Sequence, residues 1–207
     1  MPKDGLFISF EGIDGSGKST QARMLAEALE ARGKDVVLTR EPGGSEGAEE
    51  IRALVLQGNP DRWSAETELL LFTAARRDHV ERTITPALKA GKIVVCDRFA
   101  DSTRLYQGMT RGDLRGTVDA LHDLVIGLEP DLTFIIDMDP DKGHARAKGR
   151  QTIEERFEDF GTDFQHRLRG EFLQLAEEFS HRCVVIDGDA SPEIVASRVL
   201  AALDAHG

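Results

Sequence analysis

Short apolar runs recur along the chain and alternate with longer stretches in which apolar residues are spaced three or four positions apart. The short runs predict buried strands, and the longer stretches predict amphipathic helices. Strands that are apolar nearly throughout and alternate with helices indicate a parallel sheet covered on both faces. We therefore expect a three-layer α/β fold with strands at Leu6–Phe10, Val36–Thr39, Ile93–Cys96, Leu132–Asp137 and Val184–Asp187.

Three helices can be outlined from their caps and periodicity. The first carries an apolar stripe and can end at Gly33, a suitable C-cap. A longer helix is expected from residue 64 or 65 to residue 90, and Pro86 inside it could produce a kink. The last helix begins with Ser191 as N-cap and Pro192 at the first helical position. The stripe of the first helix consists of Ala22, Leu25, Ala26 and Leu29.

The domain organisation is simple. No repeat, low-complexity tract or linker-like change of composition divides the chain, which predicts a single domain over residues 1–207. Glycine and charge coincide with weak apolar periodicity between Gly149 and Gly161, and we expect a mobile lid at approximately residues 146–161. The two cysteines, Cys96 and Cys183, lie in apolar runs, so we expect buried thiols rather than a disulfide or a zinc site.

Composition narrows the class of partner. With 40% hydrophobic and 30% charged residues, the chain has the profile of a soluble globular protein. No apolar run is long enough to cross a bilayer, and the first residues lack the features of a signal peptide, so we expect a cytoplasmic protein without a membrane partner. The net charge of −11 argues against a nucleic acid as the main partner. A small anionic ligand would need local basic groups.

One motif supplies such groups. The first predicted strand is followed by Gly12–Ser19, which fits the Walker A pattern G-x-x-x-x-G-K-[ST] and precedes an amphipathic helix. Its glycines allow main-chain N–H groups to surround anionic oxygens, Lys18 adds a positive charge for the outer phosphates, and the Ser19 hydroxyl can bind magnesium. The predicted ATP-binding residues are Gly12, Ile13, Asp14, Gly15, Ser16, Gly17, Lys18, Ser19 and Thr20.

The Walker A motif alone leaves the function open, because kinases, GTPases and motor ATPases all use it. No guanine-reading element follows any predicted strand, which argues against a GTPase. Asp137 ends an apolar strand and is either a Walker B carboxylate or an ordinary strand-end residue. A small kinase would need, in addition, a second anion site for the acceptor.

The sequence offers candidates for that second site. Arg98 follows a predicted strand, at the edge where open α/β sheets bind ligands. Phe72 and Arg76 are four residues apart on the long helix, so they share a face that suits a planar base, although core packing explains Phe72 equally well. A cationic cluster suits a lid that neutralises a transferring phosphate, or else a solvated helix face, and consists of Arg146, Lys148 and Arg150.

With these motifs, the sequence resembles the thymidylate kinases. The resemblance covers essentially the whole chain and implies a P-loop NTP hydrolase-like fold that transfers the γ-phosphoryl group of ATP to dTMP, in dTTP biosynthesis. It further implies Mg²⁺ as cofactor and a homodimer with the long helix at the interface. The motifs that carry it are Phe7–Thr20, Thr39–Gly44, Leu71–Arg76, Asp97–Phe99, Ser102–Gly108 and Glu155–Glu158.

The resemblance also implies roles for single residues. Phe72 would stack on thymine, Arg76 would hydrogen-bond its edge, and Arg98 would hold the dTMP phosphate. Tyr106 would crowd the 2′ position and favour the deoxy sugar, and Asp14 would contact the acceptor sugar or the metal shell. The implied dTMP site is Glu41, Arg52, Phe72, Arg76, Arg98, Ser102, Thr103, Tyr106, Gln107 and Glu158, with Glu155 nearby, and the implied catalytic set is Lys18, Arg98, Asp14, Arg146 and Arg150.

The family divides by the position of a catalytic arginine, which sits either in the cradle or in the lid. This chain has Gly15 at the cradle position and Arg146 and Arg150 in the lid region, so it resembles the lid-arginine branch. Phe99 departs from the Tyr or His of many relatives, and a hydroxyl contact there is lost. Two other hypotheses stay open: a kinase for another nucleoside or monophosphate, and a nucleotide-dependent switch without an acceptor.

Overall fold

The computed structural model describes residues 5–57, 62–109, 113–147 and 161–206. Its strands form one parallel five-stranded sheet in the order β2-β3-β1-β4-β5. The bounds of every predicted strand agree with the structure to within one residue, which confirms the α/β fold with a central parallel sheet. The strands are β1 (Phe7–Glu11), β2 (Val36–Arg40), β3 (Ile93–Asp97), β4 (Leu132–Asp137) and β5 (Cys183–Asp187).

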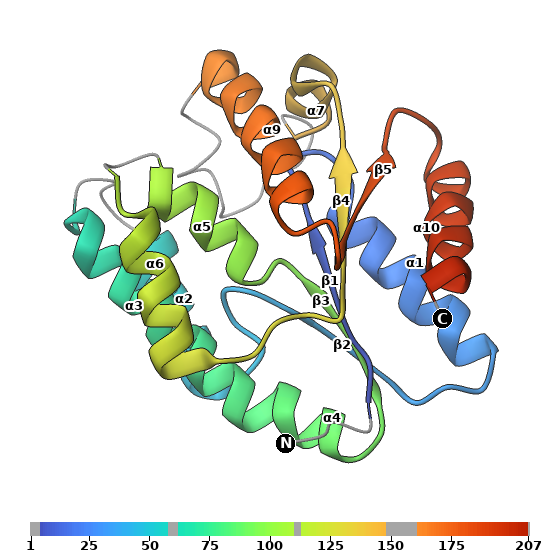
Figure 1. The fold of residues 1–207 in the computed structure, drawn as a ribbon, viewed down its shortest axis with the longest axis horizontal. Helices are drawn as coiled ribbons and strands as arrows, with labels where there is room; N and C mark the ends of the chain where they lie inside the picture. The colour runs from blue at the N-terminus through green and yellow to red at the C-terminus, as the bar shows by residue number, and fades with distance from the viewer. Residues whose placement is uncertain (1–4, 58–61, 110–112, 148–160, 207) are drawn as a thin grey trace.

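Helices cover both faces of the sheet, as Figure 1 shows. On one face lie α1 (Lys18–Ala31) and α10 (Pro192–His206). On the other face lie the remaining long helices, with α2 packed against α3. These further helices are α2 (Glu46–Leu56), α3 (Ala65–His79), η1 (Val80–Ile84), α4 (Thr85–Lys89), α5 (Ala100–Met109), α6 (Arg115–Leu121), η2 (His122–Ile126), α7 (Pro140–Ala147) and α9 (Gly161–Glu178).

The central strand β1 alternates its side chains between two cores. Ile8 and Phe10 pack in the core under α1 and α10, whereas Phe7 packs in the core under η1 and α4. By the same alternation, Ser9 and Glu11 share the face of Phe7. All five residues of β1 are fully buried, and burying each large apolar side chain contributes about 1.5–3 kcal/mol. A polar residue in this strand therefore needs a partner inside the protein.

The long helix predicted over residues 64–90 is present, but it is interrupted. α3 is followed by the π-helical turn η1 and then by α4. The N–H of Thr85 donates to the carbonyl of Val80, five residues earlier. Pro86, in the first turn of α4, has no N–H, and its ring would clash with the carbonyl four residues before it. The chain avoids this clash by changing from α-helical to π-helical hydrogen bonds just before Pro86.

The predicted helix ends and buried thiols agree with the structure, except that Arg32 is the C-cap of α1 and Gly33 follows it. α1 ends at Ala31, and Gly33 follows in the left-handed conformation with φ 76°, its N–H donating to the carbonyl of Glu30 at 2.8 Å. α10 begins at Pro192, directly after Ser191. Both cysteines are free and buried. Within the described ranges, no helix is both long enough and apolar enough to cross a membrane.

Candidate active site

The carboxyl ends of all strands meet at the upper edge of the sheet in Figure 1. The loop Gly12–Gly17 leaves β1 at this edge, and Arg98 leaves β3 beside it, because β1 and β3 pair with Phe10 opposite Asp97. Parallel pairing therefore brings together two segments that are more than eighty residues apart in the sequence. This is the edge at which open α/β sheets bind ligands.

The loop after β1 has the geometry of an anion cradle. Gly12, Gly15 and Gly17 have φ angles of 134°, 77° and 99°, a region that residues with side chains rarely adopt. Gly17 is the N-cap of α1 and has no side chain to bond the first-turn N–H groups of the helix. These donors and the positive end of the helix dipole remain for a ligand.

Two cationic side chains converge on one carboxylate beside the cradle. Lys18 Nζ donates to the carbonyl of Ile13 at 2.6 Å and lies 3.8 Å from Asp14 Oδ1. Arg98 Nη2 bonds the same Asp14 oxygen, and Arg98 Nη1 lies 3.0 Å from Ser102 Oγ. Burial opposes ionisation of Asp14, but the charges of Arg98 and Lys18 outweigh it and lower the pKa of Asp14. The guanidinium and the ammonium therefore face each other across an ionised Asp14.

The pKa of Lys18 responds to the same surroundings. Burial, with the nearby Arg98 charge as the next cause, lowers it to about 8, although Asp14, Asp97 and Glu11 oppose the change. The Lys18 side chain is only 5% exposed. An anion in the cradle would favour the charged form of Lys18 and raise its pKa again.

A cleft opens next to these cations, with about 570 Å³ of empty space that is partly open to solvent. Nine of its twelve lining residues belong to the predicted site, and three do not: Pro42, Leu56 and Phe99. The full lining is Asp14, Glu41, Pro42, Leu56, Phe72, Arg76, Arg98, Phe99, Ser102, Thr103, Tyr106 and Gln107.

One end of the cleft is built around Arg76. Its Nε donates to Glu41 Oε2 at 2.7 Å, and its Nη2 donates to Thr103 Oγ1 at 2.9 Å and to the carbonyl of Phe99 at 3.1 Å. Its Nη1 makes no hydrogen bond to any residue in the described ranges. His79, fully buried, lies 3.0 Å from the other oxygen of Glu41. Burial opposes ionisation of Glu41, but Arg76 and His79 lower its pKa, so an ionised Glu41 fixes the guanidinium.

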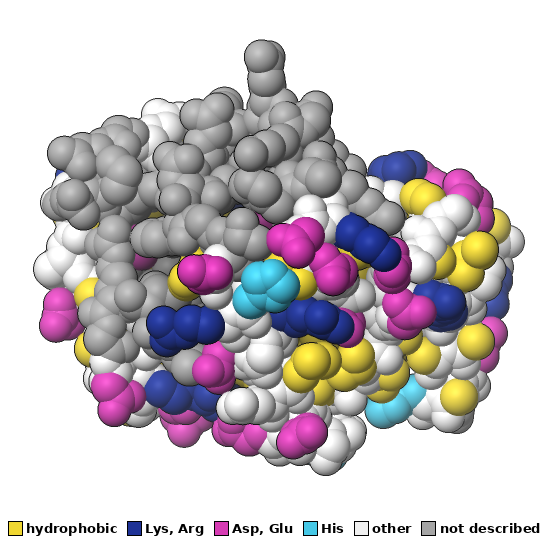
Figure 2. Space-filling view, turned by 90° about the horizontal axis from the view of Figure 1, so that it is seen from above, with side chains coloured by type: hydrophobic (Ala, Val, Ile, Leu, Met, Phe, Trp, Pro, Cys, Tyr) yellow, Lys and Arg dark blue, Asp and Glu magenta, His cyan; other side chains and the backbone are white. Residues whose placement is uncertain are grey.

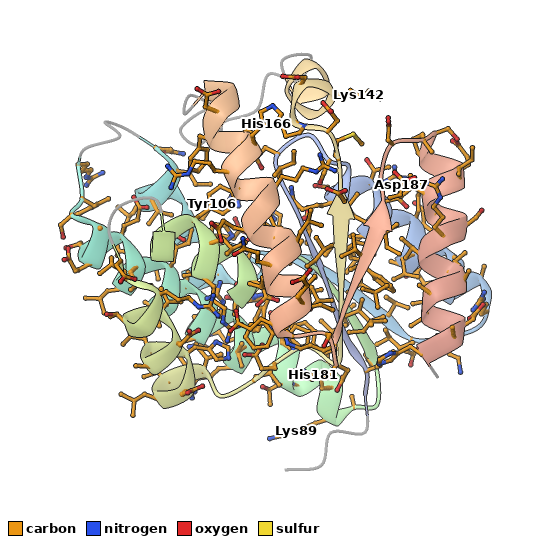
Figure 3. All side chains as sticks on the ribbon, turned by 45° about the horizontal axis from the view of Figure 1, so that its top comes forward. Lys89, Tyr106, Lys142, His166, His181 and Asp187 are labelled. Carbon is orange, nitrogen blue, oxygen red and sulfur yellow. The ribbon has the colours of Figure 1, made fainter. Side chains whose placement is uncertain are left out.

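The aromatic walls of the cleft serve two purposes. Phe72 packs with Val55 and Leu56 and also lines the cleft, so both earlier interpretations of this residue, core packing and pocket wall, fit its position. Tyr106 lies on α5, beside α9 in Figure 3, and its hydroxyl donates to Asp14 Oδ2 at 3.2 Å. Burial raises the pKa of Tyr106 well above its usual value, so the phenol is a neutral donor.

The residues at the cradle suit a magnesium ion. The Ser19 side chain is exposed at the start of α1, and Asp97 Oδ1, at the end of β3, is buried with no hydrogen-bond partner in the described structure. No cluster of three or more His, Cys, Asp or Glu side chains that could hold a metal occurs within those ranges. Mg²⁺ takes one or two protein oxygen ligands and completes its shell with phosphates and water, so the Ser19 hydroxyl and the Asp97 carboxylate are candidate ligands.

Asp137, the Walker B candidate of the sequence, has a different partner. Its two oxygens accept from Arg169 of α9 at 2.6 and 2.8 Å. This bidentate pair favours the interpretation of Asp137 as an ordinary strand-end carboxylate. Asp97 is not among the predicted site residues, although its place directly before Arg98 at a strand end is a usable sequence signal.

Other predicted residues lie beside the cleft or outside the described chain. Arg52 does not line the cleft; its Nη1 donates to the carbonyl of Pro42, a wall residue, at 2.6 Å. Arg150, Glu155 and Glu158 lie outside the residues that the structure describes, and of Arg146 only the main chain, within α7, is described. Figure 2 looks down on this edge and shows acidic and basic side chains interspersed over its described part.

The fold and the site together define a P-loop nucleotide-binding protein. A sequence model of the family described as "Thymidylate kinase" matches residues 10–199. The thymidylate kinase of Ruegeria pomeroyi is 69% identical over 199 residues, which covers 96% of this chain and 94% of the relative. The thymidylate kinase of Dinoroseobacter shibae is 63% identical over 203 residues, or 98% of each chain.

Solved structures agree with the sequence comparison. The crystal structure of thymidylate kinase from Ehrlichia chaffeensis matches with a TM-score of 0.78 at 41% identity and covers 98% of this chain and 99% of that one. The chain therefore belongs to the thymidylate kinase family and is an enzyme of that family.

Proposed function

We propose that this protein transfers the γ-phosphoryl group of ATP to dTMP, giving ADP and dTDP. The observation that carries the proposal is the convergence of Lys18 and Arg98 on one oxygen of Asp14, between the main-chain cradle and the cleft. A donor phosphate in the cradle and an acceptor phosphate beside Arg98 would meet at this point. Membership of the family supports the same conclusion.

The reaction we propose is direct in-line transfer without a covalent enzyme intermediate. Catalysis then consists of positioning and charge neutralisation. Lys18 neutralises charge on the outer phosphates of ATP, and Arg98 aligns the acceptor phosphate with the γ-phosphate. Asp14 holds both cations in place before the substrates bind, and contacts the acceptor sugar or the metal shell afterwards.

The cleft supplies the acceptor site in this proposal. Phe72 stacks on thymine, and Arg76 Nη1 donates to the edge of the base, while Glu41 and Thr103 keep the guanidinium in place. Tyr106 fills the space beside the sugar and favours the deoxy form. Gln107 and Ser102 complete the wall, and Arg52 supports it through the Pro42 carbonyl. Glu158, which lies outside the described residues, is still predicted to contribute to the dTMP site.

We assign Mg²⁺ to the Ser19 hydroxyl and the Asp97 carboxylate. The support is the exposed position of Ser19 and the buried Oδ1 of Asp97, which has no hydrogen-bond partner among the described residues. When bound, the ion would neutralise and align the phosphates of the nucleotide.

We further assign the chain to the lid-arginine branch, with Arg146 or Arg150 as the transition-state cation. The cradle has no room for a side chain at Gly15, because a Cβ there would lie 2.0 Å from the carbonyl oxygen of Gly143 in α7. Gly15 also has a φ of 77°. A cradle arginine is therefore excluded unless α7 moves, and the cation has to come from elsewhere.

The assembly we propose is a homodimer that uses the long helix. Leu70 on α3 is 55% exposed and Leu124 on η2 is 80% exposed, and these two elements pack side by side. Exposed large apolar residues on adjacent helices suit an interface between two copies. We assign the enzyme to the cytoplasm, whose reducing conditions fit two free thiols.

The proposed function is tested by coupled ADP release with ATP, Mg²⁺ and one acceptor at a time: dTMP, dUMP, dCMP and AMP. We expect the fastest turnover with dTMP. The preference over dUMP should be modest, because one methyl group is worth about 1–3 kcal/mol. Equal turnover with AMP would point to another monophosphate kinase, and slow hydrolysis that no monophosphate accelerates would point to a nucleotide switch.

A further inference from the structure

Glu11 is a buried carboxylate to which the mechanism above gives no role. It is the last residue of β1, directly before the cradle, and its side chain is 0% exposed. Its Oε1 accepts hydrogen bonds from the N–H groups of Phe99 at 2.8 Å and Ser102 at 3.2 Å, and its Oε2 accepts from the Ser102 hydroxyl at 2.6 Å. All three donors belong to the segment that follows Arg98.

The Ser102 hydroxyl connects Glu11 to the guanidinium of Arg98. Arg98 Nη1 donates to Ser102 Oγ at 3.0 Å. Because a hydroxyl has one hydrogen, and Glu11 accepts it, the lone pairs of Ser102 are left to face Arg98. The Glu11 carboxylate, at the other end of this series of hydrogen bonds, therefore fixes which atoms donate and which accept.

The main chain of Arg98 needs support as well. Its φ is 69°, and no other non-glycine residue in the described ranges has a positive φ. This conformation is disfavoured for residues with side chains and persists only where the surroundings hold it. The Arg98 N–H donates to the carbonyl of Phe10 at 2.9 Å on one side, and Glu11 binds the next N–H, that of Phe99, on the other. The residues at the end of β1 thus hold Arg98 from both sides.

We propose that Glu11 is a positioning residue for phosphoryl transfer: through the Ser102 hydroxyl and the N–H groups of Phe99 and Ser102, it fixes the orientation of Arg98. The assignment rests on the proposed function, in which Arg98 aligns the acceptor phosphate. A carboxylate is required, because a glutamine would offer an NH₂ group to Ser102. The Ser102 hydrogen would then turn toward Arg98, which has only hydrogens to offer, and the contact would weaken.

The test compares Glu11→Gln, Ser102→Ala and the double variant with the unaltered enzyme, in ADP release with dTMP at about pH 8, where Glu11 is mostly ionised because its pKa is about 7. Misplacement of a catalytic group by about 1 Å can cost on the order of 100-fold in rate. We therefore expect Glu11→Gln to lower kcat by about 10- to 100-fold, with KM for ATP nearly unchanged. Because both residues act on the same guanidinium, the double variant should be no slower than the slower single variant.

Asp131→Asn is the matched control. The Asp131 carboxylate accepts from the N–H of Phe7 at 2.8 Å, at the opposite end of the same strand, so Asp131→Asn replaces a carboxylate by an amide on that strand away from the site. We expect kcat near that of the unaltered enzyme. If Glu11→Gln retains full kcat, or if the effects of the two variants multiply in the double variant, the positioning role is wrong.

Two further outcomes are also decisive. If Glu11→Gln does not fold, Ser102→Ala tests the proposal by itself. This variant breaks the connection to Arg98 but keeps the two main-chain hydrogen bonds of Glu11. Full kcat in Ser102→Ala would overturn the proposal, and a loss of kcat would support it. If the unaltered enzyme shows no turnover that depends on dTMP, the proposed function itself fails, and the role of Glu11 fails with it.

Discussion

The contact between Gly15 and Gly143 predicts a measurable cost for the smallest side chain. In Gly15→Ala, the new Cβ would lie 2.0 Å from the Gly143 carbonyl oxygen, so α7 or the cradle has to shift. Overpacking of this kind costs about 1–3 kcal/mol. The φ of 77° adds about 1–2 kcal/mol for a residue with a side chain. We expect Gly15→Ala to lower the free energy of unfolding by about 2–5 kcal/mol.

Gly33→Ala separates the two contributions. Gly33 has nearly the same φ, 76°, but a Cβ there would meet no atom within 4 Å, and the residue lies away from the site. Urea unfolding of both variants, with equal m-values, should show about 1–2 kcal/mol for Gly33→Ala and a clearly larger loss for Gly15→Ala. Equal losses would mean that the contact with α7 does not exclude a side chain. The steric argument for a lid arginine would then fail.

Three further predictions follow from buried carboxylates. Glu41→Ala leaves the buried Arg76 charge without its carboxylate partner. We expect the free energy of unfolding in urea to fall by about 3–5 kcal/mol and dTMP to bind more weakly. A free energy of unfolding within about 1 kcal/mol of the unaltered protein would show that the ion pair is unimportant for stability. Burial and the neighbouring Asp101 raise the pKa of Glu11 from 4.5 to about 7, so the folded state loses stability as the pH rises from about 4.5 to about 7. The stability of Glu11→Gln relative to the unaltered protein should therefore rise by about 3 kcal/mol between pH 4.5 and pH 8, and a difference that is independent of pH would refute this. Asp97→Asn should raise the Mg²⁺ concentration that gives half-maximal activity by about 10-fold or more, whereas an unchanged Mg²⁺ titration would remove Asp97 from the metal site.

Features that depend on residues close together in the sequence could be predicted from the sequence. The strands follow from apolar runs and were predicted to within one residue. The cradle was predicted from glycines at fixed spacing before Lys18, and the positive φ angles of Gly12, Gly15 and Gly17 are compatible with it. Most of the cleft was predicted from the resemblance to a family rather than from periodicity. Phe72 illustrates the difference, because its spacing alone could not separate a core residue from a pocket wall, and the structure gives it both positions.

The supporting contacts could not be predicted in the same way. Glu11 meets Phe99 across 88 positions, and His79 meets Glu41 across 38. Such pairs depend on strand order and on how helices pack, which local patterns do not encode. A buried carboxylate inside an apolar strand is nevertheless a usable signal, since it needs a partner wherever the chain brings one. The π-helical turn before Pro86 likewise required the three-dimensional structure, because proline predicts an interruption but not its form.

The proposed mechanism requires that the Arg98 guanidinium, directly after β3, faces the Lys18 ammonium across the path of the transferred phosphoryl group. The most direct measurement is kcat for ADP release with dTMP in Arg98→Ala, alongside the ATP dissociation constant of the same variant and an exposed control, Arg23→Ala. We predict that Arg98→Ala loses about 1000-fold or more in kcat, while its ATP affinity and the activity of the control stay close to those of the unaltered enzyme. Turnover in Arg98→Ala at the level of the control would contradict the account.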